Sequence, residues 1–242
     1  MNLTPETTVA DVATALPRAI PVFQKHGIDF CCGGRRPLRE VCAEKGLAFA
    51  ALAGEIATSA TSAEPGDRDW TAAPFADIVA RIVDGYHAGL RTELPRLEAL
   101  LVKVAAAHGE AHGDTLVPLG ETFRQIRSEL ESHMEKEEQV LFPYLLELET
   151  ASRGLRPAGS IPLGLAAGAI GVMEREHEAA GLALTTLRRL TGGYRPPDGA
   201  CASFRALYAG LEIFESDLHQ HIHLENNVLF PRGLGMERRL SG

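Results

Sequence analysis

Two stretches of the sequence share one pattern: His133-Met134-Glu135-Lys136-Glu137-Glu138-Gln139-Val140-Leu141-Phe142-Pro143 and His221-Ile222-His223-Leu224-Glu225-Asn226-Asn227-Val228-Leu229-Phe230-Pro231. Reduced to their shared letters, both follow H-x3-E-x2-V-L-F-P. In an α-helix, residues four apart lie on the same face, about 6 Å apart along the axis. Each stretch therefore predicts a helix that presents one imidazole and one carboxylate side by side, an arrangement suited to binding a metal ion.

The repeat extends upstream of these two stretches. His87 precedes His133 by 46 residues, and His177 precedes His221 by 44. Self-similarity at such a spacing indicates a structural unit that occurs twice. The sequence therefore predicts two pairs of antiparallel helices, whose inward faces carry four His and two Glu at matching heights.

The composition favours an all-α fold and excludes some partners. Of the 242 residues, 45% are hydrophobic but only 6% are aromatic, which favours helix over sheet. The net charge of −8 argues against a nucleic-acid partner. The N-terminus shows no secretory signal, and the longest apolar stretch, 161–173, is too short to span a membrane. Four cysteines, two of them adjacent, do not form a disulfide framework, so the cytoplasm is the expected compartment.

Turn and cap residues divide the sequence into four predicted parts: a small helical domain at 1–58, a linker at 59–72, a four-helix bundle at 73–233 and a tail at 234–242. Short helices are expected from Val9 onwards and over 18–26, 37–45 and 49–58. Long helices are expected over 74–108, 119–148, 163–190 and 200–230, with a polar loop at 109–118. The Leu-Phe-Pro end of each repeated stretch is interpreted as structural, with apolar packing beyond the site and a proline that ends the helix.

Six side chains are the candidate metal ligands: His87, His133, Glu137, His177, His221 and Glu225. Buried without partners, they would cost roughly 1–3 kcal/mol each, and a shared metal site removes that cost. If each Glu bridges, two metal ions each receive two imidazoles and two carboxylate oxygens, with room for an oxo or hydroxo bridge. This donor set suits iron, manganese or zinc, and an iron pair is favoured because open mixed N/O sites in helix bundles typically serve redox chemistry. A ferritin-type site is disfavoured, since only Glu174-Arg175-Glu176-His177 has the Glu-x-x-His spacing.

The other histidines and the charged run have simpler interpretations. His26, His112, His219 and His223 are interpreted as solvated or capping residues, and the role of His108 is left open. The run 135–138 is interpreted as mostly a solvated face, in which only Glu137 keeps register with His133.

Adjacent thiols stand in the segment Asp29-Phe30-Cys31-Cys32-Gly33-Gly34. The two glycines are expected to adopt backbone angles that other residues avoid. A disulfide between neighbouring residues closes a strained ring and is not expected as a structural staple. A reactive pair, for thiol exchange or for holding iron or nitrosyl iron transiently, is preferred over an accidental pair of buried residues. Cys42 and Cys201 are interpreted as packing residues.

Together these motifs resemble one known family, the Repair of Iron Centres di-iron proteins, over nearly the whole chain. The Cys-Cys-Gly-Gly segment is similar to that family's first domain, and residues 86–87, 133–138, 176–178 and 221–231 are similar to its hemerythrin-like second domain. The resemblance implies a hemerythrin-like four-helix bundle preceded by a small helical domain, with two iron ions held by the four His and bridged by Glu137 and Glu225. It also implies that Glu129 and Glu176 lie near the site, and it aligns His108 with a loop histidine of the relatives.

The function that the resemblance implies is repair of iron–sulfur clusters damaged by nitrosative and oxidative stress, by iron donation, by nitric oxide consumption or by both. Damaged iron–sulfur proteins would be the clients, nitric oxide or oxygen the small ligands, and Cys31 and Cys32 the catalytic thiols. A second hypothesis is a hemerythrin-like protein that binds or senses oxygen or nitric oxide reversibly, and a third is a structural zinc bundle. The sequence leaves open whether the chain has nitric oxide reductase-type activity and whether it forms a homodimer.

Overall fold

Caps and turn residues define the short helices of an N-terminal module. The side chain of Thr8 accepts a hydrogen bond from the backbone N–H of Asp11 (3.1 Å) and caps the first helix. Gly46, at φ +65°, ends the third helix in the left-handed conformation. The protein is seen here in a computed structural model that describes residues 3–61 and 69–241. The module comprises α1 (Val9–Ala15), η1 (Pro17–Ala19), α2 (Ile20–Lys25), α3 (Leu38–Lys45) and α4 (Phe49–Thr61).

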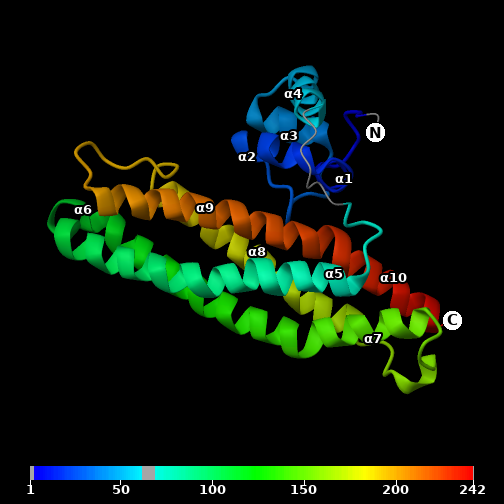
Figure 1. Cartoon of the computed structure of the whole chain (residues 1–242). Helices are drawn as coiled ribbons and strands as arrows, with labels where there is room; N and C mark the ends of the chain where they lie inside the picture. The colour runs from blue at the N-terminus through cyan, green and yellow to red at the C-terminus, as the bar shows by residue number, and fades with distance from the viewer. Residues whose placement is uncertain (1–2, 62–68, 242) are drawn as a thin grey trace.

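The helices from α5 onwards form four rods, which can be followed in Figure 1. The first rod contains α5, η2 and the first half of α6, and the second contains the rest of α6, η3 and α7. The third rod is α8, and the fourth contains α9, η5 and α10. The bounds are α5 (Phe75–Ala80), η2 (Arg81–His87), α6 (Ala88–Lys136), η3 (Glu137–Leu141), α7 (Phe142–Ser152), η4 (Ala158–Ser160), α8 (Ala166–Leu190), α9 (Ala202–Leu224), η5 (Glu225–Leu229) and α10 (Phe230–Ser241). This architecture confirms the predicted all-α bundle with a small helical module before it.

The helices differ from the predicted ones in three places. The loop predicted at 109–118 is helical, and only His112 (φ −130°, ψ 21°) leaves the helical conformation, at the kink where α6 reverses direction. Pro231 does not end the fourth rod, because it occupies the first turn of α10, where a missing N–H costs little. The predicted tail is therefore helical as far as Ser241. Helix α4 also covers the first three residues of the predicted linker, whose residues 62–68 lie outside the described residues.

Two apolar clusters fill the bundle, one on each side of a polar layer. One cluster includes Leu90, Leu130 and Leu218, and the other includes Ile82 and Leu229. All four rods contribute to both clusters, as the spacing of apolar residues by three and four predicts. The six predicted metal ligands lie in the layer between them.

The module has its own apolar core and lies against α9, above the bundle in Figure 1. Gln24 donates to the hydroxyl of Ser216 on α9 (2.8 Å), and Arg35 pairs with Glu174 on α8 (3.4 Å). Within the described ranges, no helix combines the length and the apolar character that a membrane span requires.

Candidate metal centre

The two repeated stretches form the same local structure. His133 lies in the last turn of α6, and Glu137 is the first residue of η3. Nε2 of His133 and Oε2 of Glu137 lie 3.4 Å apart. His221 and Glu225 are related in the same way across α9 and η5, with Nε2 and Oε1 2.9 Å apart. Both η3 and η5 are π-helical, and so is η2, which ends at His87. Such segments are rare and occur frequently at functional sites.

All six predicted ligands converge between the rods. Their ligand atoms form two groups of four, in each of which the atoms lie within 4.8 Å of one another. The groups are His87, Glu137, His221 and Glu225, and His133, Glu137, His177 and Glu225. Each carboxylate thus belongs to both groups, as the bridging hypothesis requires, and all six residues are buried. Whether these residues bind metal remains a prediction.

The carboxylate oxygens and imidazole nitrogens of the layer are incompletely paired with one another. Both oxygens of Glu137 and Oε2 of Glu225 are buried without a hydrogen-bond partner among the described residues. The Nε2 atoms of His87 and His221 lie 3.2 Å apart, and those of His133 and His177 lie 3.0 Å apart. Two neutral imidazoles in such contact could share only one proton. Imidazole nitrogens in mutual contact and carboxylate oxygens without partners are the donor set that a pair of cations would complete.

Three of the imidazoles have a partner on their other ring nitrogen. Nδ1 of His87 lies 2.6 Å from Glu138, Nδ1 of His133 lies 2.8 Å from Glu176, and Nδ1 of His177 lies 2.8 Å from Asn226. Such contacts fix the tautomer and ring orientation that metal-binding histidines need. Nδ1 of His221 has no partner among the described residues, and this ring stacks on Tyr86 at a centroid distance of 5.2 Å.

Charged neighbours shift the pKa values of one histidine and one carboxyl of the site. Burial lowers the pKa of His133, but the negative charges of Glu137 and Glu225 outweigh burial and raise this pKa to about 9. Burial raises the pKa of the Glu225 carboxyl, but the imidazoles of His221 and His177 lower it well below its usual range. The Glu225 carboxylate is therefore ionised at neutral pH, which is the form that binds cations.

A turn built on Asp29 presents the adjacent thiols to the bundle. The carboxylate of Asp29 accepts hydrogen bonds from the backbone N–H groups of Cys31 (2.9 Å), Cys32 (3.0 Å) and Gly33 (2.8 Å). The sulfur of Cys32 lies 3.5 Å from the carbonyl oxygen of His177 on α8. Neither cysteine forms a disulfide. The thiol turn therefore lies directly on the helix that carries one of the predicted ligands.

The two thiols differ in accessibility. Cys31 is buried, whereas Cys32 is partly exposed. A hydrogen bond to the sulfur of Cys32, burial and the nearby charge of Asp29 raise the pKa of the Cys31 thiol well above its ordinary value. Cys31 is therefore held as the neutral thiol at neutral pH, and Cys32 is the more accessible sulfur.

Comparison with known proteins identifies the family. Residues 78–232 match the family described as Hemerythrin HHE cation binding domain, and residues 5–60 match ScdA_N, described as Domain of Unknown function (DUF542). The chain is 39% identical over 230 residues to the iron-sulfur cluster repair protein YtfE of Pectobacterium atrosepticum, which covers 95% of this chain and 97% of that protein. It is 41% identical over 226 residues to the iron-sulfur cluster repair protein YtfE of Yersinia pestis (strain Pestoides F), covering 92% and 94%. The chain belongs to the iron-sulfur cluster repair family.

Membership of the iron-sulfur cluster repair family confirms the resemblance that the motifs carry. The cation binding domain match contains all six predicted ligands, and the ScdA_N match contains the thiol turn. The comparisons therefore link the two features that the sequence singled out, the duplicated His and Glu pattern and the adjacent cysteines, to two domains of this family.

Two residues around the centre of this iron-sulfur cluster repair family member were not anticipated. Glu138, interpreted as part of a solvated face, instead accepts hydrogen bonds from His87 and from Arg91 (2.8 Å). Asn226 makes the corresponding contact to His177. In each repeat the residue after the shared Glu thus contacts the histidine of the preceding rod. The repeat itself carried this signal, because both residues occupy the same position in the aligned stretches.

Some of the other histidines also differ from their interpretation. His223 is neither solvated nor capping: it is buried, and its ring packs on Phe30 of the module at 5.6 Å. Burial lowers the pKa of His223 to about 4. His219 is partly buried and also packs on Phe30. Both residues serve the contact between module and bundle rather than the metal layer.

The histidines near the far end of the bundle lie away from the metal layer. His108 contacts the sulfur of the exposed Cys201 (Nε2 to Sγ, 3.2 Å), and His112 stands at the α6 kink. Glu129, implied to lie near the site, forms a hydrogen bond with Gln125 and lines a cavity that reaches His133.

The glycines of the thiol turn are required for space rather than for backbone angles. Neither Gly33 nor Gly34 has a positive φ. A Cβ on Gly34 would lie 2.7 Å from the carbonyl oxygen of Phe30, and one on Gly33 would lie 2.9 Å from the carboxylate of Asp29. The tight wrapping of the turn around Asp29 therefore excludes side chains at both positions.

Proposed function

We propose that this chain repairs damaged iron–sulfur clusters and uses a pair of iron ions held in the polar layer of the bundle. His87 and His221 would bind one ion, His133 and His177 the other, and Glu137 and Glu225 would bridge them. The observation that carries this proposal is the geometry of two groups of four buried donors that share both carboxylates. The names of the relatives, iron-sulfur cluster repair proteins, support the assignment of the activity.

The chain's own residues support exchange with the surroundings of the centre. When bound, the iron pair would supply redox chemistry and an iron source for repair, with nitric oxide or oxygen as small ligands. A cavity of about 570 Å³ reaches His133 and His177 and is lined by Glu129, Lys136 and Glu176, among others. Charged side chains at this cavity suit the passage of a hydrated ion. Glu176 connects the cavity to the centre, since it accepts hydrogen bonds from both His133 and Lys136.

The thiol pair is proposed to act in the same process. Cys32 is partly exposed and touches the backbone of His177, so a sulfur donor lies next to the helix that carries a ligand. Cysteine sulfur binds iron well as the thiolate, and iron binding would displace the proton of the Cys31 thiol. We propose that Cys31 and Cys32 hold iron or nitric oxide briefly between the centre and a client protein.

Metal analysis and a repair assay test the proposal together. Protein purified without added metal should contain iron, and the iron-loaded chain should restore activity to an iron–sulfur enzyme whose cluster has been destroyed by nitric oxide. A Glu137→Gln/Glu225→Gln double variant should contain little iron and should not restore the enzyme's activity. Replacement of both cysteines by Ser should impair repair and leave the iron content unchanged. Zinc in place of iron would overturn the proposal, as would equal repair by the Glu variant.

The same assay separates the two routes of repair. Donation predicts that iron leaves the chain as the client recovers. Consumption of nitric oxide predicts repeated turnover while the chain keeps its metal.

A further inference from the structure

Asn226 joins a predicted metal ligand to the thiol turn. Its Oδ1 lies 2.8 Å from Nδ1 of His177, and its Nδ2 donates to the carbonyl of Cys31 at 3.4 Å. The amide nitrogen can only donate, so Oδ1 faces His177 and must accept from Nδ1–H. His177 then carries its proton on Nδ1 and directs the lone pair of Nε2 into the polar layer. One side chain thus fixes the tautomer of His177 and contacts the backbone of Cys31.

The matching residue of the first repeat has no such link to the described part of the module. Glu138 follows Glu137 as Asn226 follows Glu225, and Glu138 contacts Nδ1 of His87 at 2.6 Å. Its second partner is Arg91, on the same rod as His87. Among the residues that the structure describes, the outer contact of a predicted ligand extends to the module only in the second repeat.

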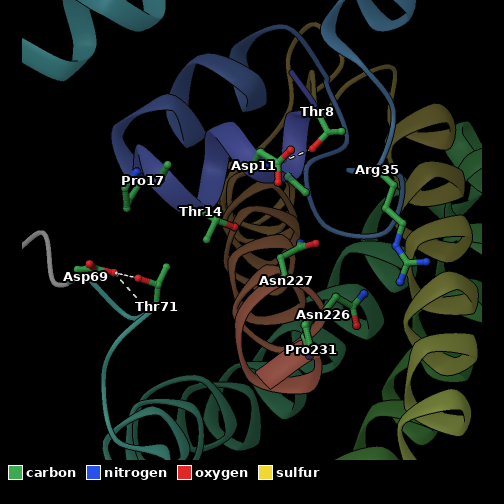
Figure 2. A pocket seen from close by; sticks show the side chains of 12 residues that line it. Thr8, Asp11, Thr14, Pro17, Arg35, Asp69, Thr71, Asn226, Asn227 and Pro231 are labelled. Carbon is green, nitrogen blue, oxygen red and sulfur yellow. Dashed lines mark hydrogen bonds between the residues drawn. The ribbon is translucent and has the colours of Figure 1, made fainter. Parts of the chain in front are cut away.

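The neighbouring Asn227 provides an internal comparison. Figure 2 shows Asn226 and Asn227 extending from the same segment of the fourth rod, close to Arg35 of the module. Asn227 donates to the carbonyls of Phe30 (3.2 Å) and Cys31 (3.4 Å) and contacts Nδ1 of His223 (3.0 Å). The two amides therefore share the thiol turn as a partner, but the hydrogen bond to His177 belongs to Asn226.

We propose that Asn226 is a positioning residue that makes iron retention depend on the docked thiol turn. While the turn is docked, the Cys31 carbonyl holds the amide with Oδ1 towards His177, and His177 directs Nε2 at the iron. Displacement of the turn removes that carbonyl, so the amide no longer keeps the imidazole in place and iron leaves faster. The proposal rests on the proposed function, because it requires iron at the centre.

Iron release from the full-length, iron-loaded chain tests this role. The rate of transfer to an excess of a coloured ferrous chelator is measured without oxygen for the wild type, Asn226→Ala, Asn226→Asp and Asn227→Ala. Asn226→Ala should release iron roughly 10-fold faster, the usual effect of losing an outer partner of a metal-bound histidine. Asn226→Asp should stay close to wild type, because a carboxylate still accepts from Nδ1–H. Asn227→Ala should also stay within about twofold, because it removes a contact with the turn but none with His177.

A second measurement tests the link to the thiol turn. Iodoacetamide is applied to a Cys201→Ser background, in which Cys32 is the accessible thiol because Cys31 and Cys42 are buried. Mass spectrometry verifies that Cys32 alone is modified. The added group should displace the turn and speed iron release several-fold, but it should add nothing in the presence of Asn226→Ala, since both changes remove one and the same contact.

The outcomes separate this proposal from the proposed function. Release by Asn226→Ala no faster than by the wild type, or release by Asn226→Asp as fast as by Asn226→Ala, would overturn the role of Asn226 alone. Equal acceleration by alkylation with and without Asn226→Ala would overturn the link to the turn. A wild-type chain that retains no iron would overturn the proposed function and this proposal with it.

Discussion

Glu137 and Glu225 each lie between two histidines, one from each group of predicted ligands. Oε2 of Glu137 lies 3.4 Å from Nε2 of both His87 and His133, and Glu225 lies 2.9 Å from Nε2 of His221 and 3.2 Å from Nε2 of His177. Both carboxylates are 0% exposed. A buried anion costs several kcal/mol unless cations or hydrogen bonds compensate it. Two buried carboxylates in one layer therefore need positive charge close by, which metal ions would supply.

Replacement of one shared carboxylate tests whether metal ions supply this positive charge. Glu137→Gln should lose at least about half of the iron, because an amide is a weaker ligand than a carboxylate and Glu137 belongs to both groups of donors. Iron is measured by elemental analysis of the purified protein. Glu135→Gln removes the same charge from an exposed position two residues away and should keep its full iron content. Equal iron in both variants would contradict the bridging role.

Replacement of Glu138 tests the outer contact of the first repeat. Glu138→Gln weakens the acceptor that faces Nδ1 of His87 and should lower iron affinity about 10-fold without abolishing binding. Competition with a chelator of known affinity measures the change, and Glu135→Gln again serves as the control. An affinity equal to that of the control would mean that Glu138 only screens Arg91.

The sequence predicted that the six inner side chains converge, but it did not predict which side chains contact them from outside. The inner six follow from helical periodicity and from the repeat, which together bring i and i+4 side chains of four rods to one height. Glu138 and Asn226 do not follow from periodicity, because they lie one residue beyond the inward register. They reach the neighbouring rod because a π-helical segment begins at Glu137 and at Glu225 and changes the direction of the following side chains.

At the scale of elements, helix ends were harder to predict than helices. The residues 109–118 are polar and rich in glycine, which favours a loop, yet His108 and His112 pack on Phe204 (5.4 and 5.7 Å) and the backbone stays helical up to the kink. Tertiary contacts of this kind override local propensity. The continuation of the fourth rod as α10 has a similar cause, since Glu237 on α10 has partners outside its own helix.

Glu237, on α10, caps the N-terminus of α8. One carboxylate oxygen accepts hydrogen bonds from the backbone N–H groups of Gly164 (2.8 Å), Leu165 (3.0 Å) and Ala166 (3.2 Å), and from the hydroxyl of Tyr144. These groups would otherwise be unpaired donors at the start of a helix. Burial raises the pKa of Glu237, but the hydrogen bonds from Tyr144 and the backbone outweigh it and lower this pKa below its ordinary value of 4.5.

A Glu237→Gln variant should therefore be less stable, by roughly 1–3 kcal/mol at neutral pH. A carboxyl with a lowered pKa in the folded state contributes stability above its unfolded pKa, and the contribution is lost as pH falls through the folded pKa. The difference between wild type and variant should thus be constant above about pH 5 and shrink below about pH 4.5. Urea unfolding followed by circular dichroism at several pH values measures it. Glu121→Gln, at an exposed position of α6, should show neither effect, and a pH-independent difference for Glu237→Gln would contradict the role of its charge.

At the scale of the whole molecule, the polar layer divides the bundle into two apolar halves. Each rod crosses the layer once, and the apolar clusters on its two sides do not share residues. Four imidazoles and two carboxylates in the interior are a weak point of the core unless they are fully paired. A metal pair would tie all four rods together at this height, so its effect on stability should extend over the bundle.

Removal of iron should therefore lower the melting temperature of the whole bundle. A ligand at about a thousandfold above its dissociation constant stabilises the folded state by about 4 kcal/mol, which corresponds to roughly 10 °C for a chain of this size. Calorimetry of the iron-loaded chain and of the chain stripped by a chelator measures the shift. The Glu137→Gln/Glu225→Gln double variant should melt at one temperature with or without the chelator, because it has lost the shared ligands. A stripped wild type that melts with the loaded one would mean that the hydrogen bonds within the layer suffice to hold the rods together, and that metal adds chemistry to the bundle without adding stability.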